Sequence, residues 1–340
     1  MATIPRGSSA GRRWSRLDFA LAGRAARCGR VGAFVYEFLC FGLKQASACL
    51  FGGLMVALLV ASWRWYPARA PLARYDFLTL AALAIQGILL AAKLESREEA
   101  KVILLFHVVG TVMELFKTAV GSWSYPEPSL LRLGGVPLFT GFMYASVGSY
   151  IARAWRLFDF RFTRHPPFGA TVALAAATYL NFFAHHWLPD ARPLLFLAVA
   201  WLFGPCWVHF RIRRVHRRMP LLLGFVLVAL FIWLAENLGT FSHAWLYPAQ
   251  RHGWHMVPFG KLGAWLLLMI ISYVMVSALH RRPPGSGCNL PAALQFRDSS
   301  PPPCPQRPEC SRRTARSPVM TPNWPRPSPT KGGARKTTSS

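Results

Sequence analysis

The sequence predicts an all-α membrane protein whose eight transmembrane helices form a tandem, parallel 4+4 repeat, with both termini in the cytoplasm. Three observations lead to this prediction. The 340-residue chain is 53% hydrophobic but only 15% charged, whereas about 25% of the residues in soluble domains are charged. Its apolar runs approach the roughly 20 residues that a helix needs to cross a hydrocarbon core of about 30 Å. A set of spaced residues also recurs at a constant offset.

The predicted crossings follow the apolar runs. They are 45–62, 76–93, 102–119, 136–154, 168–187, 193–209, 220–238 and 258–279. The preceding stretch, 31–44, is interrupted by Glu37 and Lys44, so it is either an interfacial amphipathic segment or the cytoplasmic end of the first helix. Past Arg282 the chain is rich in Pro, Ser and Arg, a composition that cannot bury a core and predicts disorder.

This reading divides the chain into four regions. They are a basic cytoplasmic N-terminal segment (1–30), a first four-helix repeat (31–155), a second four-helix repeat (156–280) and a disordered, Pro/Arg-rich cytoplasmic tail (281–340).

Basic residues are concentrated in alternate connections. The segments 1–30, 93–101, 153–165 and 211–218 carry seven, three, four and five Lys or Arg residues. The remaining connections carry few basic residues but many Trp and Tyr residues, which are typical of a membrane interface. Because positively charged loops stay on the cytoplasmic side, an even number of crossings places both termini there.

The net charge of +26 suggests a nucleic-acid partner only at first sight. Of these charges, 15 lie in residues 1–30 and 281–340, and most others lie in the basic loops that membrane topology explains. We therefore expect the lipid bilayer, and no specific nucleic acid, as the partner. The seven cysteines form no CxxC pair, so reduced thiols are expected, with no metal site and no cofactor.

The strongest internal signal is a repeated motif, E-x3-T-x4-W-x-Y-P. Its first copy is Glu114, Thr118, Trp123, Tyr125 and Pro126, and its second is Glu236, Thr240, Trp245, Tyr247 and Pro248, at a constant offset of 122 residues. A Val-Pro step follows each copy, at Val136 and Val257, and is expected to start a helix. Since each unit has an even number of crossings, the two halves should be parallel and related by a pseudo-twofold axis along the membrane normal. The axis would make the helices at 102–119 and 220–238 equivalent, with the two helices facing each other.

The repeat singles out two intramembrane acids as candidate catalytic residues, Glu114 and Glu236. A carboxylate at this depth is costly and should face the bundle interior or a wet cavity. Polar or aromatic residues on the same helix faces and in the outer loops are candidate substrate-binding residues: His107, Thr118, Trp123, Tyr125, Asn181, His185, Thr240, Trp245 and Tyr247.

Three interpretations of the two acids remain open. Each acid could be a structural anchor that bonds a neighbouring helix or a basic partner such as Lys117 or Lys261. The pair could instead share a proton, because two like charges cannot both ionise when close together. They could then act as a general acid in an enzyme or carry protons in a transporter. In the third interpretation, the glutamates and outer-face histidines bind a metal.

Several stretches resemble a bacterial integral-membrane family known as domain-of-unknown-function family 817. They include MELFKTAVGSWSYPE (113–127), GGVPLFTGFMYASVGSYIARAWRLFDFRF (134–162) and AENLGTF (235–241). The resemblance covers roughly residues 31–280 and implies a bacterial inner membrane. That family has no assigned activity, so it implies no catalytic residues.

A looser likeness concerns the acid, the aromatic motif and the Val-Pro step. Glu114, Gly121, Trp123, Tyr125, Val136 and Pro137 form a pattern similar to that of the carotenoid hydratases and membrane lycopene cyclases, which act on polyenes by acid catalysis. The best hypothesis is therefore a membrane-embedded, acid-catalysing enzyme that acts on a lipid or isoprenoid at the repeat interface. A proton-coupled transporter and a non-catalytic scaffold are the alternatives.

Overall fold

The computed structural model describes residues 21–25, 27–67, 69–213 and 216–280, so most of the predicted N-terminal segment and the predicted tail lie outside the described residues. The α-helices are α2 (Gly29–Ala48), α3 (Leu50–Trp65), α4 (Arg74–Ala91), α5 (Arg97–Ala119), α6 (Phe139–Phe158), α7 (Phe168–Ala184), α8 (Arg192–Phe203), α9 (Leu221–Phe241) and α10 (Gly260–His280). A short 3-10 helix, η1, spans Pro248–Gln250.

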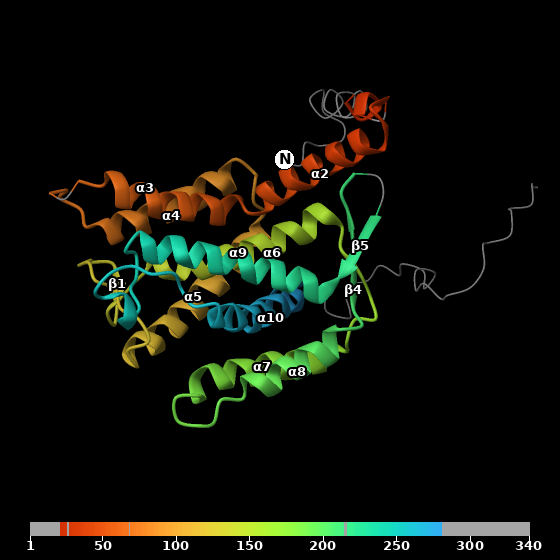
Figure 1. Ribbon diagram of the computed structural model, residues 1–340. Coiled ribbons are helices and arrows are strands. Elements are labelled where there is room, and N and C mark those ends of the chain that lie inside the picture. Colours follow the sequence, from red (N-terminus) through yellow and green to blue (C-terminus); the bar gives the residue numbers. More distant parts are fainter. Residues whose placement is uncertain (1–20, 26, 68, 214–215, 281–340) are drawn as a thin grey trace, which may run out of the picture. The chain divides into compact units, whose positions relative to one another are not determined.

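The strands are few and short. They are β1 (Arg132–Leu133), β2 (Val136–Pro137), β3 (Arg161–Thr163), β4 (Trp207–Arg211) and β5 (His216–Pro220). The first two pair antiparallel, and the other three form an antiparallel sheet in the order β3-β4-β5. In Figure 1 that sheet and β1 lie at opposite ends of the long helices.

Local sequence sets the ends of several helices. The α5 helix begins with a capping box, in which the Ser96 hydroxyl accepts a hydrogen bond from the Glu99 amide at 3.2 Å and the Glu99 carboxylate accepts one from the Ser96 amide at 2.7 Å. This exchange satisfies backbone donors that the first helical turn leaves free. The α6 helix ends at Phe158, and the next residue, Asp159, adopts a left-handed conformation with φ of 51°.

Four described helices, α4, α5, α9 and α10, are long and apolar enough to cross a membrane. The number rises to five if α2 and α3 form one span, although these two helices are bent by 70° at their junction. The chain is therefore mostly helical with several membrane-capable helices, as predicted. The full count of eight crossings stays a prediction.

Two predicted segments differ in detail from the structure. The run 193–209 contains α8, which is only 12 residues long and therefore about 18 Å in length at ~1.5 Å per residue. The α8 helix ends just before Pro205, which has no amide hydrogen with which to continue the helical hydrogen bonds, and β4 follows. The unclear stretch 31–44 lies within α2, which is a separate helix at an angle to α3.

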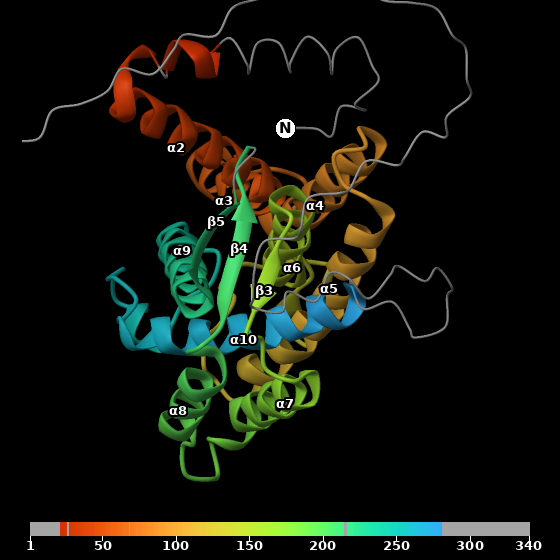
Figure 2. The ribbon, with the colours of Figure 1, turned by 90° about the vertical axis from the view of Figure 1, so that its right-hand side faces the viewer.

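The helices pack mainly through α6 and α10, which contact each other. The α5 helix packs on α6 and α9 packs on α10, whereas α3 pairs with α4 and α7 with α8. Figures 1 and 2 show this arrangement from two sides. These contacts place α6 and α10 at the centre of the bundle. The glutamate helices α5 and α9, which were predicted to face each other, pack mainly on α6 and α10 instead. Both Val-Pro steps lie just before helices, since α6 begins at Phe139 and α10 at Gly260.

Contacts between loops distinguish the two ends of the bundle. At one end, Arg156 binds Glu99, and Asp159 lies 3.4 Å from Arg211. At the other end, the buried Asp76 accepts hydrogen bonds from the amides of Leu130 and Leu131. Each of these contacts thus joins two regions that the sequence assigns to the same side of the membrane. Among the cysteines, Cys28, Cys40, Cys49 and Cys206 are free thiols, while the other three lie outside the described residues.

Candidate functional site

Glu114 is buried on α5 and is surrounded by aromatic hydrogen-bond donors. Its carboxylate accepts a hydrogen bond from the Trp123 indole at 2.6 Å and another from the Tyr144 hydroxyl at 2.8 Å. The Tyr125 hydroxyl donates a third. Because the side chain is only 5% exposed, these three donors replace the water that would otherwise solvate the carboxylate.

Glu236 on α9 has a matching environment. Its carboxylate accepts hydrogen bonds from the Tyr247 hydroxyl and, at 2.6 Å, from the Trp265 indole. The side chain is 3% exposed. In both clusters a tyrosine comes from the loop after the glutamate helix, and another donor comes from the next long helix. The two acids are therefore held by neutral donors from the same kinds of element, and Glu114 has an additional loop donor in Trp123.

The loops that carry these donors bind each other directly. Ser124 donates its amide to the Leu246 carbonyl at 3.0 Å, and Leu246 returns the bond at 2.9 Å. Beside this bridge, the Trp123 and Tyr247 rings meet edge to face with centroids 6.0 Å apart. The Lys261 ammonium lies 4.4 Å from the centre of the Tyr247 ring. The two glutamate clusters therefore form one continuous polar and aromatic region.

This region closes one end of a cavity of about 1330 Å³. Both glutamates line the cavity, and its remaining walls are mostly apolar side chains from α2, α3, α6, α9 and α10. Aromatic rings such as Phe41, Phe160 and Phe210 line its opposite end, near the β3-β4-β5 sheet. Mostly apolar walls with a few convergent polar groups are typical of a ligand site.

The structure brings together most of the residues that the sequence singled out. The predicted residues that line the cavity are Glu114, Trp123, Tyr125, Asn181, His185, Glu236, Trp245 and Tyr247. Three others do not line it: His107 packs its ring on Phe142, Thr240 bonds to Trp254 and Asn237, and the Thr118 hydroxyl is buried without a hydrogen-bond partner.

Sequence reasoning missed the donors that come from the next helices, Tyr144 and Trp265. A signal for them does exist, because they are 121 residues apart, the same offset that relates Val136 to Val257. Their different side chains hide this equivalence from an identity search, although each places one donor on a glutamate. Lys117, Lys261 and Arg192 also line the cavity.

The phenols of the loop tyrosines stay protonated and can therefore donate. Burial, together with the nearby Glu114 charge, raises the pKa of Tyr125 well above its usual range. Burial and the Glu236 charge do the same for the pKa of Tyr247. Each glutamate thus faces a hydroxyl that retains its proton at neutral pH.

The two lysines suggested as partners of a structural anchor make their direct contacts with other groups. The Lys117 ammonium is 2.9 Å from Nε2 of His186, and Lys261 lies over aromatic rings. In the part of the chain that the structure describes, no three His, Cys, Asp or Glu side chains are grouped so that they could hold a metal ion. The hydrogen bonds of the glutamates instead come from aromatic residues.

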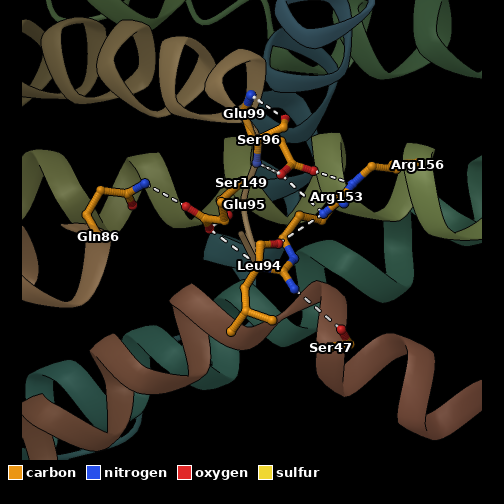
Figure 3. A network of polar contacts seen from close by, with 9 residues as sticks. All are labelled: Ser47, Gln86, Leu94, Glu95, Ser96, Glu99, Ser149, Arg153 and Arg156. Carbon is orange, nitrogen blue, oxygen red and sulfur yellow. Dashed lines mark hydrogen bonds and ion pairs between the residues drawn. The ribbon is translucent and has the colours of Figure 1, made fainter. Parts of the chain in front are cut away.

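A second buried polar network lies near the opposite end of α5 (Figure 3). The Glu95 carboxylate accepts hydrogen bonds from Gln86 at 2.6 Å and Ser149 at 3.0 Å, and it lies 3.8 Å from the Arg153 guanidinium. Burial raises the pKa of Glu95, against the opposing effects of these partners. The residues 122 positions after Glu95 and Glu99 are Arg217 and Leu221, so the second half has no matching acids.

Comparison with known proteins supports the family resemblance. Residues 37–273 match the family model described as "Protein of unknown function (DUF817)". The chain is also 44% identical over 245 residues to "Uncharacterized protein YoaT" of Bacillus subtilis (strain 168), covering 72% of this chain and 92% of that protein. No solved structure matches the chain. The matched region contains both glutamates and all their aromatic donors, and this chain belongs to the DUF817 family.

Proposed function

We propose that this protein is a membrane-embedded enzyme that performs acid catalysis on a lipid or isoprenoid bound in the cavity. The observation that carries the proposal is the placement of Glu114 and Glu236 at the same end of one large, mostly apolar cavity. Apolar walls suit a hydrocarbon chain, and the glutamates supply the groups that can transfer protons.

The donors around Glu114 suit the role of a general acid. When its carboxyl group gives a proton to a carbon-carbon double bond, a new C–H bond forms, and a carboxylate and a carbocation remain. The indole of Trp123 and the two tyrosine hydroxyls already point at that carboxylate. Preorganised donors of this kind stabilise charge as it develops. The aromatic rings nearby can stabilise the carbocation, and Glu236 can accept a proton when it collapses to product.

Deuterium labelling tests this chemistry. Membranes that contain the full-length protein are incubated in D₂O, and the extracted lipids are examined by mass spectrometry for deuterium bound to carbon. We expect labelling with the wild type, and its loss with Glu114→Gln and with Glu236→Gln. The exposed Glu98→Gln variant is the matched control. Unlabelled lipids in wild-type membranes, or full labelling in both variants with folded protein present, would overturn the proposal.

A proton-coupled transporter is the second candidate, and the reciprocal contact between Ser124 and Leu246 favours it. Parallel-repeat transporters place their binding sites between equivalent halves, and this cavity is lined by helices from both halves. Substrate uptake that stops when an uncoupler is added would support this candidate. A scaffold would need neither acid, so it predicts that both Gln variants behave as the wild type.

We also propose the finer topology, namely eight crossings in two parallel units, 31–155 and 156–280, in the bacterial inner membrane with cytoplasmic termini. The separation of the basic loops from the aromatic loops at the two ends of the bundle supports it. The helix contacts also support it. The contact of α3 with α6 in the first unit corresponds to that of α7 with α10 in the second, and the contact of α5 with α6 corresponds to that of α9 with α10. A pseudo-twofold axis would relate the two contacts in each case. Cysteine labelling from each side of the membrane, at the exposed position 98 and at position 127, tests the orientation.

A further inference from the structure

The glutamate end of the cavity also contains two lysines. Lys117 follows Glu114 by three residues, so both lie on one face of α5. Its side chain is 5% exposed, and its ammonium lies 4.2 Å from the centre of the Phe182 ring. Lys261 approaches from α10, with its ammonium over the Tyr247 ring. Both lysines therefore line the same end of the cavity as the acids.

A chain of contacts leads from Lys117 to a third cation. Its ammonium lies 2.9 Å from His186, whose ring packs at a tilt against His185 with centroids 4.2 Å apart. The His185 ring in turn bonds to the carbonyl of Asn181 at 2.9 Å. The side chain of Asn181 accepts a hydrogen bond from the amide of Ala191 at 3.0 Å, next to Arg192. Arg192 also lines the cavity. Its guanidinium, which is more exposed than the Lys117 ammonium, forms an ion pair with the Asp190 carboxylate at 2.5 Å.

Lys261 and Glu236 lie close enough for their charges to interact, but no direct ion pair joins either lysine to a carboxylate in the part of the chain that the structure describes. The contacts of the two ammonium groups are with His186 and aromatic rings. Both glutamates accept hydrogen bonds from uncharged donors. A cation that is buried without a counterion is unfavourable, and a bound anion would remove that penalty.

We infer that this end of the cavity binds the phosphate or diphosphate headgroup of the amphiphile, with Lys117, Lys261 and Arg192 as its ligands. Lysine and arginine are the common ligands of phosphate groups. The apolar remainder of the cavity holds the hydrocarbon chain. The substrate is then a phosphorylated single-chain lipid or isoprenoid, whose head lies beside the proton-transferring glutamates. This inference rests on the proposed function, since it names the substrate class of that site.

Binding measurements with matched probes test the inference. The full-length protein in nanodiscs of zwitterionic lipid is titrated with dodecyl phosphate, dodecanol and inorganic phosphate. We expect dodecyl phosphate to bind at least tenfold more tightly than either of the others, because it combines both halves of the ligand. Equal affinity for dodecyl phosphate and dodecanol would overturn the inference. Equal affinity for dodecyl phosphate and inorganic phosphate would also overturn it, because the site would then take a free anion.

Variants then assign the cations. Lys117→Gln and Lys261→Gln should each weaken dodecyl phosphate binding about tenfold, which corresponds to about 1.4 kcal/mol, and should leave dodecanol binding unchanged. Lys101→Gln, on the same helix but with a side chain that is 69% exposed, is the control. If a lysine variant fails to fold, Arg192→Gln at the exposed rim and the salt dependence of wild-type binding replace it. Unchanged binding in all folded variants would contradict the inference.

The two proposals can fail separately. If dodecyl phosphate binds through the lysines but lipids acquire no deuterium, the headgroup site stands and the enzyme proposal fails. If deuterium is incorporated and the lysine variants bind as the wild type, the enzyme stands and the headgroup site fails.

Discussion

Ser124 and Leu246 exchange two backbone hydrogen bonds, with N–O distances of 3.0 and 2.9 Å, although they are 122 residues apart in the sequence. Each precedes the tyrosine that binds one of the buried glutamates, Tyr125 or Tyr247. A reciprocal bond between residues at equivalent places of the repeated motif is what a twofold relationship produces. This bridge therefore connects the two acid clusters and fixes the position of the donors.

Replacing Leu246 by proline should destabilise the protein, because proline has no amide hydrogen to donate to Ser124. We expect a loss of about 1–3 kcal/mol in the free energy of unfolding from the unsatisfied carbonyl, measured as a lower Tm in detergent. Leu246→Ala keeps the amide and should retain most of the stability. Equal Tm values for the two variants would show that the bridge is not important.

Gly110 permits the close approach of Tyr144 to α5. A Cβ atom at Gly110 would lie 2.6 Å from Cβ and Cγ of Tyr144, so Gly110→Ala should displace the tyrosine that binds Glu114 and lower the Tm. At Gly87 in α4 a Cβ atom would meet nothing within 4 Å. Gly87→Ala should therefore keep or raise the Tm, because alanine favours helix by up to ~1 kcal/mol.

The buried Arg153 network should be sensitive to the loss of one partner. Arg153 is 2% exposed, and its removal in Arg153→Met leaves the Glu95 carboxylate buried without its cation. Breaking such a pair costs about 3–5 kcal/mol, which denaturant unfolding would measure. Lys101→Ala removes a lysine from an exposed pair with Glu98 and should change stability by no more than about 1 kcal/mol. Similar effects in the two variants would contradict this account.

Tyr144→Phe tests the donors around Glu114. The variant removes a hydroxyl that lies 2.8 Å from the carboxylate and keeps the ring, so the fold should persist. Loss of one preorganised donor should lower the rate of deuterium incorporation about 10²-fold. Tyr66→Phe, whose hydroxyl binds the carbonyl of Leu72, should have no effect. Equal rates for Tyr144→Phe and the wild type would show that this donor does not assist proton transfer.

The sequence predicted the elements more reliably than their contacts. Apolar runs marked α4, α5, α9 and α10 within a few residues, because a long apolar stretch has few alternatives to a membrane helix. The predicted crossing at 193–209 continued past the end of α8, because β4 after Pro205 also contains apolar residues. His107 was chosen from helical periodicity, and Thr118 from periodicity and the repeated motif. Both signals indicate a shared helix face but not what that face contacts.

What the sequence by itself determined is the family, the mostly helical character and the choice of Glu114 and Glu236, because local composition and a repeated motif carry this information. Only the tertiary structure decided what surrounds those acids. Tyr144 and Trp265 reach the carboxylates from helices that are distant in the sequence, and Lys117 and Lys261 meet them at one end of a cavity. A cavity is formed by the packing of side chains across α6 and α10, and such packing depends on contacts between distant residues that no local pattern records.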